Sequence, residues 1–131
     1  MRIGAAMTDD AVHALQQHAA PGVSELELSY IVERAYVARG GTTHIHYFGA
    51  TAMSEPDVCA PAQYPTARPL APVAALVCEI SASYWEYTGL LLRTFAIADE
   101  PTPLYQELHP VADVTAAAGA PAVQVACQPA R

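Results

Sequence analysis

Residues 21–28 read Pro-Gly-Val-Ser-Glu-Leu-Glu-Leu, which indicates a chain break followed at once by the start of a helix. A Pro-Gly pair marks a turn. Ser24 and Glu27 have the spacing of a capping box, in which each side chain satisfies a backbone N–H group at the helix end. One helical face then collects the apolar residues Leu28, Ile31, Val32, Ala35 and Tyr36. Gly40-Gly41 should end this helix, because glycine readily adopts the left-handed conformation found at helix C-termini.

A second helical pattern lies upstream, over residues 3–18. Its apolar residues recur at the steps of an amphipathic helix: Ile3, Met7, Ala11, Ala14 and Leu15. The Pro21-Gly22 break separates this pattern from the capped helix. The sequence therefore predicts two consecutive helices near its start.

Downstream of the helices the pattern changes to strands. Residues 42–52 are rich in β-branched and aromatic side chains and predict a strand. Residues 54–72 contain five prolines and predict an extended loop without regular pairing. The nearly continuous apolar run at 73–81 is typical of a buried strand, and 84–98 supplies another. With a turn within residues 83–89, the two runs predict a long antiparallel hairpin.

A third helix should open at Pro101-Thr102-Pro103, since proline is tolerated in the first helical turn. Pro110 is expected to kink this helix or end it early. Residues 115–131 form an Ala/Pro-rich tail that we expect to be weakly ordered, or ordered only by a partner. These patterns predict one α+β domain over residues 1–131, with about three helices packed on a small, mainly antiparallel sheet.

Composition and charge exclude several classes of function. The chain has 131 residues, 13 acidic and 6 basic side chains, and a net charge of −7. Nucleic acid and anionic membranes are unfavourable partners, because both require clustered cations. No apolar run approaches the roughly 20 residues of a membrane span. We find no signal-peptide pattern at the N-terminus and expect a cytoplasmic protein. The three cysteines have no metal-like spacing and predict free thiols.

The order of these elements resembles the first half of the creatinase, methionine aminopeptidase and Xaa-Pro peptidase superfamily, whose fold is called pita-bread. Four segments carry the resemblance: residues 21–28, Arg68-Pro69-Leu70 leading into Val77-Cys78-Glu79-Ile80, Tyr84-Trp85-Glu86-Tyr87, and Leu92-Arg93-Thr94-Phe95-Ala96-Ile97. The resemblance spans about residues 1–115. It implies half of a pita-bread domain, in which two pseudo-symmetric halves enclose one cleft.

The resemblance also implies where metal ligands would stand. In the peptidases, two Asp of the hairpin and three residues of the second half hold two divalent metals. The first Asp position falls on Glu79, which keeps a carboxylate, and the second falls on Leu90, which cannot bind a metal. With one of the five ligands left, we expect no metal site and no cofactor in this chain.

A hairpin as apolar as residues 73–97 would normally be covered on both sides. We expect the three helices to cover one face and to leave a sheet edge and the cleft face open as an association surface. We therefore expect a second protein chain that supplies the other half of the cleft, a hetero-oligomer being favoured and a homodimer possible.

Glu79 is the candidate catalytic residue, because a buried carboxylate is costly unless it is paired or does chemistry. The alternative is an ion pair with Arg93 across the hairpin. His46 and Tyr47 are candidate substrate-binding residues, and alternation places His44 and His46 on one strand face. The alternative for both histidines is a solvated strand face.

Two further groups complete the candidates. Asp57 and Cys59 lie in the Pro-rich loop, about where the resemblance implies a substrate-contacting His, and are further candidate substrate-binding residues. The alternative is a loop acid and an incidental thiol. Tyr84, Trp85 and Tyr87 at the hairpin turn are candidate interface residues, because aromatic side chains with a polar tip suit a contact surface.

Three functions remain open. The first is a subunit of a heteromeric, metal-independent enzyme acting on a small amino-acid-like substrate, with C–N chemistry such as hydrolysis, elimination or ring closure in secondary-metabolite biosynthesis. The resemblance allows this, since creatinase works without metals. The second is a non-catalytic subunit that binds or stabilises a partner chain. The third is a metal-dependent aminopeptidase, which the missing ligands disfavour.

Overall fold

The structure is a computed structural model that describes residues 2–58, 60–119 and 127–129. In chain order its helices and strands are α1 (Arg2–His18), α2 (Glu25–Arg34), the short 3-10 helix η1 (Val37–Arg39), β1 (Thr42–Ala52), β2 (Ala74–Tyr84), β3 (Tyr87–Thr88), β4 (Leu91–Ile97), α3 (Pro103–Gly119) and β5 (Cys127–Pro129). The α+β class and the mainly antiparallel sheet are confirmed.

The second helix begins as the sequence predicts. Ser24 caps α2, and its hydroxyl accepts a hydrogen bond from the backbone N–H of Glu27 while the Glu27 carboxylate accepts one from the backbone N–H of Ser24. Gly40 ends η1 with a φ of 82°, which is left-handed. The predicted start of α2 is therefore confirmed. Its predicted end at Gly40-Gly41 is wrong, because α2 ends at Arg34 and the left-handed Gly40 ends η1 instead.

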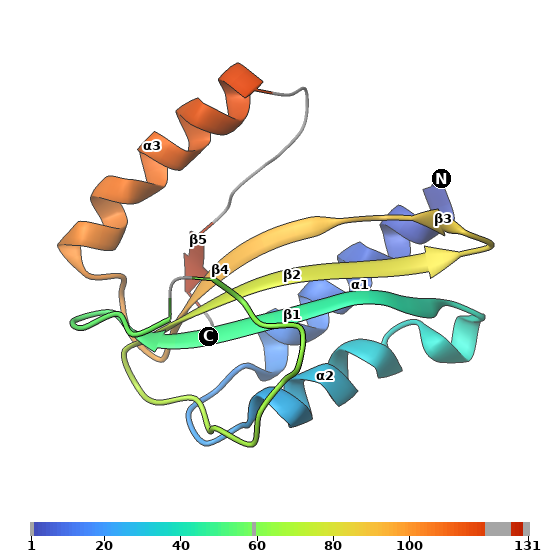
Figure 1. Cartoon of the computed structure of the whole chain (residues 1–131), viewed down its shortest axis with the longest axis horizontal. Coiled ribbons are helices and arrows are strands. Elements are labelled where there is room, and N and C mark those ends of the chain that lie inside the picture. The colour runs from blue at the N-terminus through green and yellow to red at the C-terminus, as the bar shows by residue number, and fades with distance from the viewer. Residues whose placement is uncertain (1, 59, 120–126, 130–131) are drawn as a thin grey trace.

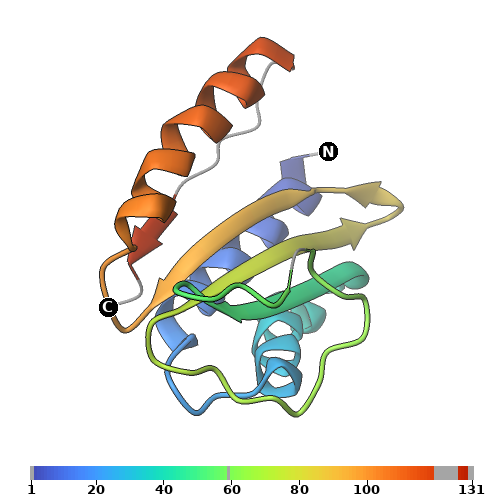
Figure 2. The ribbon, with the colours of Figure 1, turned by 60° about the vertical axis from the view of Figure 1, so that its left-hand side comes forward.

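The sheet has the order β1-β2-β4-β5, and β3 pairs with the end of β2. β2 pairs antiparallel with both β1 and β4, whereas the short β5 runs parallel to β4. Figures 1 and 2 show α1 and α2 together on one side of the sheet and α3 set apart from them. The predicted hairpin is present as β2, β3 and β4.

The hydrophobic core lies between the sheet and the layer formed by α1 and α2. Its largest buried side chains are Met7, Leu15, Leu28, Val32, Tyr36, Phe48, Leu76, Ile80 and Ile97. Along β2 the core takes every second residue, because successive strand side chains point to opposite faces. The remaining residues of β2 therefore face away from the two helices.

That second side of the sheet is here called the open face, defined by Ile45, Tyr47, Val77, Glu79, Leu92 and Thr94. The strand register sets Tyr47 and Leu92 on either side of Glu79 in one cross-strand row. At one end of this side, Tyr105 of α3 packs against a cluster of Met53, Ala75 and Ala96. The open face itself keeps apolar surface exposed, since Leu92 is 44% exposed.

Pro110 lies inside α3 and does not end it, so the early end expected from the sequence is wrong. An internal proline costs a helix about 3 kcal/mol. The alanines that follow have the highest helix propensity and help α3 to continue to Gly119. The predicted tail at 115–131 therefore begins inside a helix, and residues 120–126 of it lie outside the described residues.

The hairpin turn is tighter than the predicted 83–89 segment. Trp85 and Glu86 form it, with φ angles of 49° and 65°. Two positive φ angles are typical of a type I′ turn, which normally selects Asn and Gly. Gly89 lies beyond the turn, so two bulky residues carry the left-handed strain.

Glu86→Gly should raise the free energy of unfolding by about 1 kcal/mol, because glycine adopts positive φ without a steric cost. Urea unfolding followed by circular dichroism measures this change. Glu100→Gly, in an exposed segment whose φ is not positive, is the matched control and should not stabilise the chain. Equal effects of the two changes would contradict the strained turn.

Candidate functional site

Glu79 is the charged residue of the open face. Its side chain is half-buried between Tyr47 and Leu92, and among the described residues it makes no hydrogen bond or ion pair. The alternative pairing with Arg93 is wrong, because the register places Arg93 opposite Cys78 and so on the other face of the sheet. The Arg93 guanidinium donates to the backbone oxygen of Leu92. Glu79 thus presents a carboxylate in apolar surroundings.

The donor set of the open face does not fit a two-metal site. Glu79 is its one carboxylate, and exposed Leu90 stands at the second implied ligand position. Over the described ranges, no group of three or more His, Cys, Asp or Glu side chains could hold a metal ion. Hard divalent metals require several oxygen or nitrogen ligands in one place. The single carboxylate of the open face is too few for such a site.

His46 does not share the open face with Glu79. It is 6% exposed, and its Nε2 lies 2.8 Å from the Tyr36 Oη, which lies 2.7 Å from the Thr43 Oγ1. Burial lowers the pKa of His46 to about 4, although the nearby Glu33 carboxylate partly opposes the shift. The imidazole is therefore neutral at pH 7 and joins β1 to Tyr36, which lies between α2 and η1. The alternative of a solvated face is wrong for His46.

The prediction that His44 and His46 share a face fails at a β-bulge. The register shifts between Thr43 and Ile45, so His44 is left out of the β1–β2 ladder. His44 is exposed, whereas His46 is buried. A bulge adds one residue to a strand and breaks the simple alternation that the prediction assumed.

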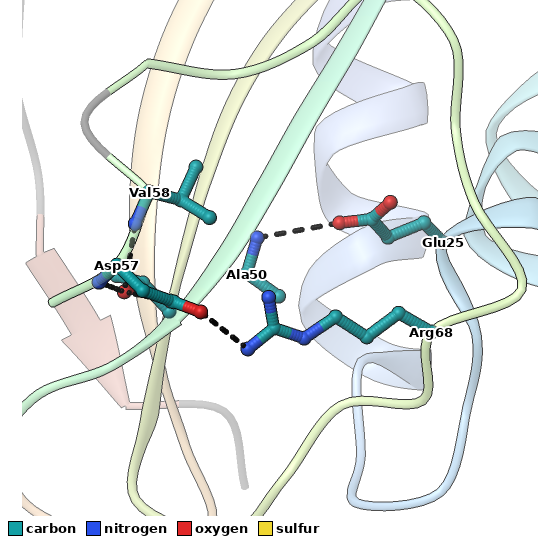
Figure 3. Close-up of polar contacts among 6 residues, drawn as sticks. Glu25, Ala50, Asp57, Val58 and Arg68 are labelled. Atoms are coloured by element: carbon teal, nitrogen blue, oxygen red, sulfur yellow. Dashed lines mark hydrogen bonds and ion pairs between the residues drawn. The ribbon is translucent and has the colours of Figure 1, made fainter.

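Asp57 lies where the Pro-rich loop meets β1, and Figure 3 shows it reaching toward Arg68. Its Oδ1 accepts a hydrogen bond of 2.8 Å from the Thr51 hydroxyl, and its Oδ2 accepts one of 3.2 Å from the Arg68 Nη2. The Thr51 hydrogen bond, helped by the Arg68 charge, lowers the pKa of Asp57. Asp57 is therefore an ionised anchor of the loop. Cys59, the neighbouring candidate, lies outside the described residues.

The predicted interface residues differ in exposure. Trp85 is 80% exposed and Tyr87 is also exposed, so both aromatic side chains project from the hairpin tip. Tyr84 is instead partly buried against the core. Two of the three aromatic residues thus offer free contact surface.

Glu25 is a polar residue that the sequence reading treated only as part of a motif. It is 5% exposed, although it stands in the first turn of α2. Its Oε2 accepts hydrogen bonds from the backbone N–H and the hydroxyl of Thr66, at 2.9 and 2.8 Å. Its Oε1 accepts one from the backbone N–H of Ala50, at 3.3 Å, which Figure 3 shows. In the sequence, the only indication that Glu25 makes these hydrogen bonds is its place directly after the helix cap Ser24.

No described helix is long and apolar enough to cross a membrane. A model of metallopeptidase family M24 matches residues 1–128. Among curated proteins, none matches the sequence.

Solved structures share the fold at low sequence identity. Dipeptidase PepE from Mycobacterium ulcerans is 20% identical with a TM-score of 0.67, and the match covers 82% of this chain and 28% of that one. Escherichia coli aminopeptidase P, solved as a His-to-Ala variant, is 16% identical with a TM-score of 0.70, over 84% and 24% of the two chains. The prolidase from Pyrococcus horikoshii is 17% identical with a TM-score of 0.72, over 83% and 30%.

The chain thus spans 24–30% of the length of these solved structures. The common part comprises most of this chain, so the likeness places its helices and sheet in the first half of the pita-bread fold.

Proposed function

This chain belongs to metallopeptidase family M24, and on that premise we propose that it is one subunit of a heteromeric, metal-independent enzyme for a small amino-acid-like substrate. The named activities of the similar structures, a dipeptidase, an aminopeptidase and a prolidase, support this substrate class. The reaction is C–N chemistry, such as hydrolysis, elimination or ring closure, in cytoplasmic secondary-metabolite biosynthesis.

The observation that carries the proposal is Glu79. Its carboxylate has no protein partner among the described residues, yet it is half-buried in a row with Tyr47 and Leu92. A carboxylate loses hydration in such surroundings and regains free energy when a cation pairs with it. The ammonium group of an amino-acid-like molecule supplies that cation. The alkyl part of the same molecule can pack against Leu92, which lies opposite Glu79.

Glu79 has two chemical roles in this proposal. As an anion it binds and orients the substrate ammonium group. As a base it accepts a proton from that nitrogen, which leaves a neutral amine with a free lone pair. The partner chain supplies the remaining acid or base groups and covers the open face, where exclusion of water strengthens the Glu79 interaction.

Metal independence rests on the donor set. Leu90 occupies the position where the family would place a second carboxylate, and leucine cannot coordinate a cation. We expect the complex to retain full turnover after chelation with EDTA. Stoichiometric manganese, cobalt or zinc in the purified complex would favour the metal-dependent aminopeptidase instead.

The second candidate is a non-catalytic subunit that stabilises its partner. The exposed aromatic side chains of Trp85 and Tyr87 favour it, because aromatic residues are enriched at the centres of protein interfaces. In this case the partner chain performs all the chemistry, and the Glu79 carboxylate is dispensable for turnover.

Glu79→Gln separates the two candidates. Turnover of the complex recovered by co-expression with the neighbouring genes should fall about 100-fold or more, since general acid–base groups contribute that much. Native mass spectrometry should show the same assembly for the variant, because glutamine has nearly the same shape.

Glu86→Gln is the matched control for this experiment. Glu86 stands on the same hairpin but in the exposed turn, and the change should leave turnover within about twofold. Full turnover of the Glu79→Gln complex would show that Glu79 is not a catalytic residue and would favour the non-catalytic subunit.

A further inference from the structure

The Pro-rich loop is tied to the first helix pair by one buried carboxylate. Glu25 joins three segments that are distant in sequence: the start of α2, Ala50 in β1 and Thr66 in the loop. Hydrogen bonds to an ionised acceptor are shorter and stronger than neutral ones. The backbone adds to this tie, since the N–H of Leu26 donates to the Thr66 carbonyl oxygen at 3.1 Å. One end of the loop is therefore fixed.

The other part of the loop is fixed against β1. The Asp57 carboxylate binds the Thr51 hydroxyl, and the Arg68 guanidinium holds Asp57 from the far side of the loop. Ala62 and Phe48 exchange two backbone hydrogen bonds, of 3.2 and 2.7 Å. The loop thus returns to β1 at two separate places, and Glu25 and Asp57 fasten it at both ends.

Gly49 lets the loop lie directly on the strand. A Cβ atom added at Gly49 would lie 3.0 Å from the Val58 Cγ1 and 3.1 Å from the Pro61 Cα. Because β1 alternates, Gly49 stands on the same side of the sheet as Tyr47, about 7 Å further along the strand. Val58 and Pro61 therefore form an apolar wall beside the row that contains Glu79.

We propose that Glu25 is a positioning residue that sets this wall and thereby limits the size of the group bound next to Glu79. This inference rests on the proposed function, because it assumes that an ammonium ligand pairs with Glu79. With the wall in place, we expect the site to favour a compact substituent on the bound nitrogen. Loss of the Glu25 contacts would free the Thr66 end of the loop and leave the wall held by the Asp57 and Ala62 contacts alone. We expect the less constrained wall to shift and admit a bulkier group.

Two probes of different size test this proposal on the full chain. Glycinamide and leucinamide carry the same ammonium group, but only leucinamide has a branched side chain. Their dissociation constants can be measured from the amide chemical shifts of Tyr47 and Glu79. We expect wild-type protein to bind glycinamide about tenfold more tightly, since a misfit of a few carbon atoms has an effect of that order.

Glu25→Gln should reduce this preference to within about twofold and speed hydrogen exchange at the Thr66 amide about tenfold or more, because glutamine offers one acceptor where Glu25 offers two. Glu27→Gln, two residues away on the same helix, is the matched control. Glutamine also completes a capping box, so that variant should keep the wild-type preference. Gly49→Ala provides a second route, since its Cβ would lie 3.0 Å from the Val58 Cγ1 and 3.1 Å from the Pro61 Cα and would push the wall outward while the Glu25 contacts remain.

Glu79→Gln separates the failure of this inference from the failure of the proposed function. If Glu79→Gln abolishes binding while Glu25→Gln and Gly49→Ala both keep the tenfold preference, Glu25 does not position a wall. Unchanged binding in Glu79→Gln, or no binding of either probe to wild-type protein, would overturn the ligand site on which both proposals rest.

Discussion

Gly4→Ala should lower the free energy of unfolding by about 2 kcal/mol, although glycine to alanine in a helix normally stabilises by up to about 1 kcal/mol. The reason is the contact between α1 and the hairpin. A Cβ atom at Gly4 would lie 2.3 Å from the backbone oxygen of Tyr87, and that atom cannot rotate away. Gly89 approaches from the other side, with a Cβ position 2.7 Å from the Ala5 Cα. The helix and the hairpin therefore meet through two glycines.

Urea unfolding followed by circular dichroism measures the effect of Gly4→Ala. The matched control is Ala6→Gly, in the exposed part of the same helix, which should lose about 1 kcal/mol from helix propensity alone. The two variants make opposite changes, so propensity alone would give effects of opposite sign. A stabilised Gly4→Ala protein would show that α1 does not rest against the hairpin in solution.

Acid should destabilise the chain through His46 by roughly 3 kcal/mol between pH 6.5 and pH 4. Burial holds the pKa of His46 near 4 in the folded chain, whereas an unfolded histidine titrates near 6.5. The unfolded state therefore binds the proton first. The contribution of His46 to stability is complete above pH 6.5 and is lost as the pH falls toward 4.

His46→Gln isolates this effect, because glutamine cannot titrate but can still reach the Tyr36 hydroxyl. The fall in unfolding free energy from pH 7.5 to pH 4.5 should be smaller in the variant by about 2 kcal/mol or more. The carboxylates that do not interact with His46 are common to both proteins and cancel in the difference. The same pH dependence in both proteins would contradict a neutral, buried His46.

Local signals in the sequence predicted much of the fold. The capping box of Ser24 and Glu27 placed the start of α2, and the composition of residues 42–52 gave the full extent of β1. These features depend on neighbours in the chain, so a sequence pattern contains them. The early end expected at Pro110 was wrong, since the helix propensity of the following residues outweighs one proline.

The residues of the candidate site were harder to predict from the sequence than the fold was. Glu79 could be picked out because a carboxylate inside an apolar strand is unusual at any register. Glu25 could not, because its role depends on donors 25 and 41 residues away, which only the folded chain brings together. The placement of His46 likewise depends on a bulge at His44, and the sequence gives no marker for that bulge.

The chain contains a single tryptophan, and the strained turn holds it almost fully in solvent. Its indole emission in the isolated chain should therefore resemble that of the denatured protein and report unfolding poorly. For the same reason the emission is a label-free probe of assembly. Burial of Trp85 against another chain would shift the emission to shorter wavelength and shield it from iodide quenching.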